Sequence, residues 1–205
     1  SCLPFFIAEL LVCVLGRDVF VYAFEQLRAR TVTYELLSSL ACAVTLADTA
    51  LDFFLPARAA LTDPFHTVAM LGMSCALLGR ALLFGAMYDT FRVAAVGEPD
   101  YLVTVTAGGA AKRRGSAQGF SRCAQREDAA SHWQSVLLPV FLAAAVVFGV
   151  LSTLETKQNA LLAWNLSVML ASANLLAFPM VCALPLKRIA ARLAKSGSAV
   201  AGFSG

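Results

Sequence analysis

Two pairs of sulfur-containing residues in this chain have a spacing that suits a soft metal ion. Met180 and Cys182 lie two positions apart near the C-terminus, and Met73 and Cys75 have the same spacing earlier in the chain. A thioether and a thiolate together are ligands that suit Cu(I). The alternative is that these side chains fill gaps between packed helices, as Met and Cys often do, and the spacing alone favours this alternative.

Several ionisable residues lie within or next to apolar stretches. Asp48 and Asp52 are four positions apart, so both project from one face of a helix. A carboxylate inside a membrane is costly and marks either a functional site or a structural pair, and both interpretations stay open for Asp48. Asp52 is expected to lie near water. Arg80 is expected to extend its charge to the membrane surface, and His66 to be solvated.

Pro179 lies inside the last apolar stretch. Proline removes a backbone donor and clashes with the carbonyl four residues back, so the helix should kink or unwind there. Carbonyls freed at such a break become ligands in many ion transporters, whereas a simple packing kink is the alternative. On an unbroken helix Met180 and Cys182 would point about 200° apart, so they can share one ion only where the helix is unwound.

The elements that must position these residues are membrane helices. The chain has 205 residues, of which 59% are hydrophobic and 14% charged, against about 25% charged in soluble domains. The net charge of +3 is too small to indicate a nucleic acid partner. A helix of about 20 apolar residues crosses a bilayer. We therefore predict an all-α polytopic membrane protein with five transmembrane helices, which lie at 1–15, 36–55, 65–88, 136–154 and 160–186.

The first stretch is short, and because the chain opens without Met we expect that this span is cut. The basic residues predict the orientation. The segments 16–35, 89–135 and 187–205 carry three, six and four basic residues, whereas the two intervening loops carry only Arg58 and Lys157. The positive-inside rule places the three basic segments in the cytoplasm. The expected location is the plasma membrane, with anionic lipid as a further partner at the cytoplasmic face.

The segments between the spans differ in character. Residues 17–30 place Phe20, Ala23, Phe24 and Leu27 at helical spacing, which predicts an interfacial amphipathic helix hinged at Gly16. The loop 56–64 is expected to be exposed on the outer side. Residues 101–106 alternate in polarity and lead into a glycine pair, which predicts a strand and a turn in a small cytoplasmic insert with minor β content.

The order of several short motifs resembles the membrane domain of heavy-metal P-type ATPases. The motifs are Gly16-Arg17-Asp18, Glu35-Leu36-Leu37, Leu77-Leu78-Gly79-Arg80, Leu138-Pro139-Val140 and the span that contains Pro179. The resemblance covers essentially the whole chain. It implies a kinked first span and platform helix (1–35), a transmembrane hairpin (36–88), a vestigial actuator-like segment (89–135), a second hairpin (136–186) and a tail towards a phosphorylation domain (187–205).

The chain departs from that family at the positions that matter most for chemistry. The Cys-Pro-Cys motif reads Phe178-Pro179-Met180, the Met-Asp pair reads Tyr34-Glu35, and the Glu expected after Gly79-Arg80 is replaced by Leu82 or Leu83. Neither Thr-Gly-Glu nor Asp-Lys-Thr-Gly occurs. ATP would therefore be used only through domains outside this chain, which itself is expected to hold no cofactor.

The resemblance implies a degenerate pathway for Cu(I) or Zn(II). Met180, Cys182 and carbonyls freed near Pro179 would supply ligands, and Asp48 or Glu35 would supply charge. The competing interpretation is a non-transporting pseudo-ATPase that serves as a membrane scaffold or regulator. A third interpretation is an unrelated five-span carrier.

Overall fold

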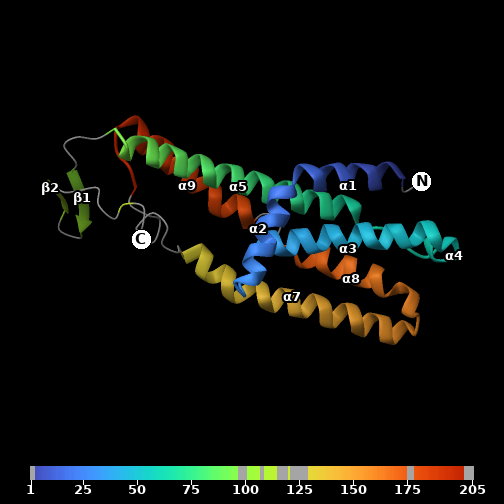
Figure 1. The fold of residues 1–205 in the computed structure, drawn as a ribbon. Helices are drawn as coiled ribbons and strands as arrows, with labels where there is room; N and C mark the ends of the chain where they lie inside the picture. The colour runs from blue at the N-terminus through green and yellow to red at the C-terminus, as the bar shows by residue number, and fades with distance from the viewer. Residues whose placement is uncertain are drawn as a thin grey trace. The chain divides into compact units, whose positions relative to one another are not determined.

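The computed structural model describes residues 3–96, 101–106, 109–114, 129–174 and 178–200, together with Phe120. Helices make up most of this structure (Figure 1). The helices are α1 (Leu3–Leu15), α2 (Arg17–Arg28), α3 (Tyr34–Phe54), α4 (Pro56–Ala59), α5 (His66–Ala94), α7 (Ala129–Thr156), the 3-10 turn η1 (Asn159–Leu161), α8 (Leu162–Ala173) and α9 (Phe178–Lys195). The strands are β1 (Tyr101–Thr106) and β2 (Gly109–Arg114).

Four helical segments in the described part of the chain are long and apolar enough to cross a membrane. They are Tyr34–Phe54, His66–Ala94, His132–Thr156 and Asn159–Lys195. The all-helical membrane architecture is therefore confirmed at this level. The prediction of a fifth span at 1–15 differs from the structure, because α1 is a 13-residue apolar helix and a span needs about 20 residues.

The chain divides into two compact units. The first contains residues 1–80 and 132–181, and the second contains residues 81–131 and 182–205. In the first unit α3 contacts α1, α2, α4 and α8. Figure 1 shows α3 running between α1 and α8. α3 is therefore the helix around which the first unit is built.

The turn between α1 and α2 lies at Gly16, as the sequence predicted. A Cβ atom added at Gly16 would lie 3.0 Å from both Met73 Sδ and the carbonyl oxygen of Val12, so a larger residue would push α2 away. α2 buries Val19 and Ala23 and leaves the larger apolar residues Phe24 and Leu27 more than half exposed. The expected apolar stripe is thus divided. Its small residue packs inward, and its large residues face outward, as on a helix that lies in a membrane interface.

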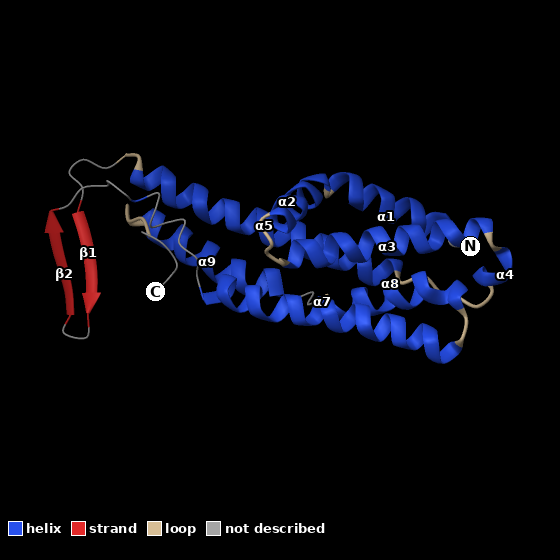
Figure 2. Cartoon of the chain, turned by 60° about the horizontal axis from the view of Figure 1, so that its bottom comes forward, coloured by secondary structure: helices blue, strands red, loops and turns tan. Residues whose placement is uncertain are grey.

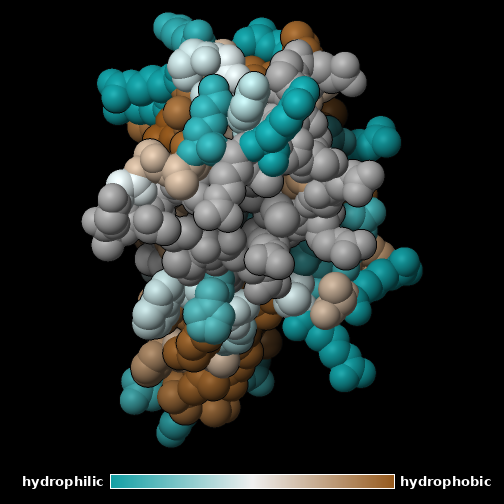
Figure 3. Space-filling view, turned by 90° about the vertical axis from the view of Figure 1, so that its left-hand side faces the viewer, coloured by the Kyte–Doolittle hydropathy of each residue, from teal (hydrophilic) through white to brown (hydrophobic). Residues whose placement is uncertain are grey.

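Much of the outer surface of the first unit is apolar. On α7, Val140, Phe148 and Leu154 are each more than half exposed. Water would make such exposure costly, whereas lipid chains would not. The space-filling view also shows hydrophobic surface beside outward-reaching hydrophilic side chains (Figure 3). This surface supports contact with a lipid bilayer.

The second unit contains an antiparallel hairpin (Figure 2). Its register runs from Tyr101 opposite Arg114 to Thr106 opposite Gly109, so the strand predicted at 101–106 is confirmed. Gly109 has a φ of 124°, a conformation that glycine adopts readily. The remainder of the predicted insert, at 97–100, 107–108, 115–119 and 121–128, lies outside the described residues.

Candidate functional site: the buried polar face of α3

One face of α3 is polar along the whole helix and is turned into the protein. Its members recur every three or four positions, and each is at least nine-tenths buried. They are Glu35, Ser38, Ser39, Cys42, Thr45, Asp48, Thr49 and Asp52. At 1.5 Å per residue this face is about 25 Å long. Leu51, Phe53 and Phe54 lie on the exposed side of the same helix. Polar groups inside a membrane are costly, so a polar face of this length requires partners or a function.

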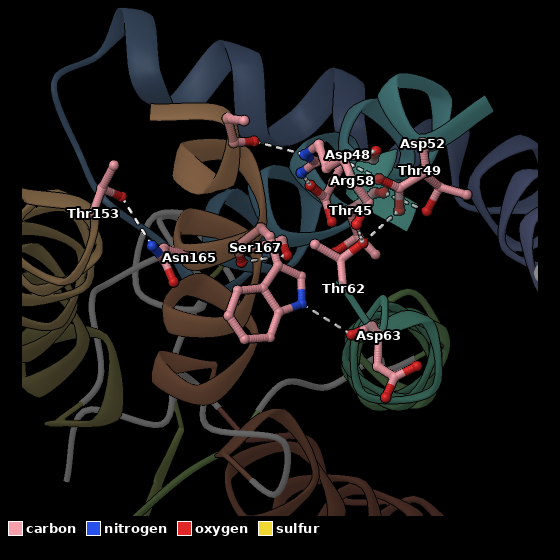
Figure 4. Close-up of polar contacts among 12 residues, drawn as sticks. Thr45, Asp48, Thr49, Asp52, Arg58, Thr62, Asp63, Thr153, Asn165 and Ser167 are labelled. Atoms are coloured by element: carbon pink, nitrogen blue, oxygen red, sulfur yellow. Dashed lines mark hydrogen bonds and ion pairs between the residues drawn. The ribbon is translucent and has the colours of Figure 1, made fainter. Parts of the chain in front are cut away.

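At the end of α3 that leads into α4, an arginine joins two carboxylates (Figure 4). Arg58 donates through Nη2 to Asp48 Oδ1 and through Nη1 to Asp52 Oδ1. Nη1 also donates to the carbonyl of Asp48 at 3.0 Å, and Nε donates to the carbonyl of Ala160 at 2.6 Å. The single turn of α4 makes this possible, because it folds Arg58 back over the last turns of α3.

This arrangement corrects two predictions. Arg58, which was expected in an exposed loop, is 4% exposed, and Asp52, which was expected to be hydrated, is 9% exposed. Thr62 donates to the second oxygen of Asp52 at 3.0 Å. Two adjacent carboxylates repel each other and are costly to bury, so they recruit the nearest cation along the chain. For Asp48 the structure therefore supports structural pairing.

His66 was expected to be solvated, and this prediction is wrong. Its side chain is buried, with Nδ1 against Glu9 Oε2 and Nε2 at 3.0 Å from Thr49 Oγ1. The ring of Phe5 stacks almost parallel to the imidazole at 6.5 Å. Glu9 is the only charged residue of α1, and a carboxylate alone in an apolar helix was the signal in the sequence that could have revealed this contact.

The middle of the polar face forms hydrogen bonds within α3 or with α5. Thr45 donates to the carbonyl of Ala41 at 2.8 Å, and Thr49 donates to that of Thr45 at 3.0 Å. Cys42 Sγ donates to the carbonyl of Ala69 on α5 at 3.3 Å. Threonine hydroxyls commonly bond to the helix carbonyl four residues back. These hydroxyl groups are thus accommodated in an apolar surrounding without leaving their own helix.

The other end of α3 places Glu35 beside Arg80 of α5. Glu35 is 4% exposed, and its Oε1 lies 3.8 Å from Arg80 Nη1, while its Oε2 is buried without a hydrogen-bond partner. The guanidinium of Arg80 also lies 4.2 Å from the ring centre of Tyr22. Arg80 therefore turns inward, which differs from the predicted extension to the membrane surface. Burial and the Glu35 carboxylate raise the pKa of Tyr22, which lies on α2 outside the spans, so this residue remains a neutral hydroxyl.

The predicted interruption of the last span lies beside this end of α3. α8 ends at Ala173, Asn174 is extended with a ψ of 108°, and α9 begins at Phe178. Asn174 Nδ2 donates to Ser38 Oγ at 3.0 Å. The helix therefore stops before Pro179, which lies in the first turn of α9, where a missing donor does no harm.

Two close contacts fix the start of α9. The ring of Phe178 meets that of Tyr34 at 6.3 Å in an edge-on arrangement. Pro179 packs against Gly79 of α5, where an added Cβ would lie 2.5 Å from Pro179 Cβ. Pro179 is thus a packing residue in this structure, and the interruption that it was expected to produce lies directly before it.

The expected metal ligands do not converge. Met180 and Cys182 both belong to α9, and a regular helix directs side chains at this spacing about 200° apart. Met73 is buried against Val19 and Cys42 in the apolar core. Within the described ranges, no group of three or more His, Cys, Asp and Glu side chains is arranged to hold a metal ion. Of the predicted residues, Glu35 is the one that combines burial, a free oxygen and a position beside the helix break.

Comparisons of the chain with protein-family models, with curated proteins and with solved structures found no match. The functional argument therefore depends on the geometry of α3 and its neighbours.

Proposed function

We propose that this chain is the membrane-spanning module of a cation transporter, built on a plan that resembles heavy-metal P-type ATPases. The observation that supports this proposal is the polar face of α3, which carries buried carboxylates near both ends and hydroxyl groups between them. Ionisable residues that face the interior of a membrane bundle are typical of ion pathways. The cation would pass along this face, between α3, α5 and the interrupted last span.

Glu35 is the proposed entry ligand. Its Oε2 is free of hydrogen bonds, and the 3.8 Å separation from Arg80 leaves room for a cation to compete for the carboxylate. Ser38 and Asn174 add a hydroxyl and an amide oxygen next to it. The last turn of α8 contributes carbonyls that have no partner within that helix. These are oxygen ligands, which suit Zn²⁺ or a harder divalent ion better than Cu(I).

Energy for transport would come from ATP hydrolysis in separate domains, because the sequence contains neither Asp-Lys-Thr-Gly nor Thr-Gly-Glu. The residues of this chain would bind the ion, shield it from lipid and release it. Arg58 would keep the opposite end of the polar face closed by holding Asp48 and Asp52.

The test is Zn²⁺ binding to the full chain in lipid nanodiscs. We expect Glu35→Gln to weaken binding at least tenfold, because it removes the only carboxylate at the helix break. The double variant Met180→Leu with Cys182→Ala serves as the matched control and should bind as the wild type does. Equal Zn²⁺ affinity in the wild type and in Glu35→Gln would overturn the proposal.

The second candidate is a non-transporting pseudo-ATPase that acts as a membrane scaffold or regulator. It is favoured by the closure of both ends of the polar face by arginines and by the divergence of Met180 and Cys182. Zinc flux into liposomes that carry the chain together with its ATP-hydrolysing partner domains separates the two candidates. Flux that is lost in Glu35→Gln supports transport, and its absence in the wild type supports the scaffold.

A further inference from the structure

Glu9, His66 and Thr49 form a hydrogen-bonded row that links three helices. Glu9 belongs to α1, His66 opens α5 and Thr49 lies on the polar face of α3. Glu9 and Thr49 are fully buried and His66 is 3% exposed. Glu9 Oε2 contacts His66 Nδ1, and His66 Nε2 lies 3.0 Å from Thr49 Oγ1. The proposed cation pathway does not require this row, so what the row does is a separate question.

The hydrogens in this row can be counted. Thr49 has one hydroxyl hydrogen, and it has two acceptors within reach, the carbonyl of Thr45 and the Nε2 of His66. A carbonyl and a carboxylate accept hydrogen bonds and never donate them. Two complete patterns therefore exist, and they differ by one proton.

In the first pattern, Thr49 donates to the carbonyl of Thr45. His66 must then donate from Nε2 to Thr49, and the contact between Nδ1 and Glu9 needs a further proton, either on the imidazole or on the carboxyl group. In the second pattern, Thr49 donates to Nε2, and Nδ1 donates to an ionised Glu9. Rotation of one hydroxyl group converts one pattern into the other without moving any heavy atom.

The surrounding charges favour the pattern that holds the extra proton. Asp48 lies close enough to His66 for their charges to interact, and Asp48 shares Arg58 with Asp52. With an ionised Glu9 this region carries three carboxylates and one guanidinium, so a proton on the row offsets part of the excess. The other titratable groups that face the row are the thiols of Cys13 on α1 and Cys42 on α3.

We propose that Glu9, His66 and Thr49 form a proton-binding site within the membrane. The site holds one exchangeable proton between the Glu9 carboxylate and His66 Nδ1, and Thr49 switches its hydroxyl hydrogen between two acceptors when that proton leaves. Glu9 Oε1 is buried and has no hydrogen-bond partner, so it is the atom that is free to accept the incoming proton. Because all three side chains are buried, the proton exchanges with water only when α1 separates from α5.

The test uses nitrogen NMR of the full chain in lipid. The sequence has two histidines, His66 and His132, so His132→Gln leaves a single imidazole to observe after histidine labelling. At neutral pH we expect Nε2 to carry a proton and Nδ1 to be protonated or to share a proton with Glu9. At alkaline pH the signal of Nε2 should change to that of a bare nitrogen, whereas Nδ1 stays protonated, because the second pattern leaves its hydrogen there.

Two variants complete the experiment. Glu9→Gln should leave one protonated nitrogen at neutral pH, a loss of one bound proton. Asp52→Asn, which removes a carboxylate that does not touch His66, should keep both nitrogens as in the wild type. A wild-type His66 with one protonated nitrogen at neutral pH would overturn the proposal, and so would a proton that leaves from Nδ1. The wild-type spectra give this result even where Glu9→Gln fails to fold.

Discussion

Replacing Arg58 with methionine tests the most highly connected polar contact of the described structure. Arg58 donates to the side chains of Asp48 and Asp52 and to the carbonyls of Asp48 and Ala160, and it is 4% exposed. Methionine fills a similar volume and supplies no charge. The substitution leaves two carboxylates four residues apart in a buried place without a counter-ion.

The expected loss of stability follows from this geometry. Removing one partner of a buried ion pair costs about 3–5 kcal/mol, because the remaining charge is desolvated and unpaired. Here two carboxylates lose the same partner, so Arg58→Met should lie at the upper end of that range. Arg58→Lys should cost about 2 kcal/mol, because one ammonium group keeps the charge but cannot reach two carboxylates and the carbonyl of Ala160 together.

The assay is equilibrium unfolding in mixed detergent micelles, followed by circular dichroism. The matched control is the triple variant Arg58→Met with Asp48→Asn and Asp52→Asn, which removes the charges together and should recover most of the loss. A loss below about 1 kcal/mol for Arg58→Met would show that water reaches the carboxylates. A triple variant no more stable than Arg58→Met would show that packing around Arg58, and not charge pairing, stabilises this end of α3.

Two further predictions concern packing and sidedness. Gly79→Ala should cost about 1–3 kcal/mol, because its Cβ would lie 2.5 Å from Pro179 Cβ and helix α9 must shift. Gly85→Ala is the control and should cost less, since its Cβ meets only the end of a flexible lysine side chain. In a cysteine-free background, Ala60→Cys should react with an impermeant external reagent and Lys112→Cys should not. The reverse labelling pattern would contradict the orientation inferred from the basic residues.

The helices were predictable because their signal is local. The length of each apolar stretch indicated α3, α5, α7 and the last span, and alternation of polarity indicated β1 with its observed bounds. The boundaries were less predictable. α5 continues to Ala94, past the expected end at 88, because helical hydrogen bonding does not stop where the apolar stretch stops. α1 was expected to be part of a span, and composition alone cannot distinguish a short packed helix from one.

The polar partners depend on tertiary structure and were harder to predict. The spacing of Asp48 and Asp52 indicated a shared face, but their pairing with Arg58 depends on the turn that α4 makes. Glu9 and His66 are 57 residues apart, and only the docking of α1 against α5 brings them together. A sequence read one residue at a time therefore assigns His66 to water, whereas the packed structure gives it a carboxylate.

The two ends of the polar face of α3 differ in how firmly they are closed, and this difference sets a direction for the proposed transport. Arg58 makes direct hydrogen bonds to both of its carboxylates and to two carbonyls. Arg80 is 3.8 Å from Glu35, a separation at which the pair is held mainly by charge. Separating the second pair costs less, because fewer hydrogen bonds are lost. A cation should therefore exchange first at Glu35, beside the helix break, and release at the other end requires Arg58 to leave Asp48.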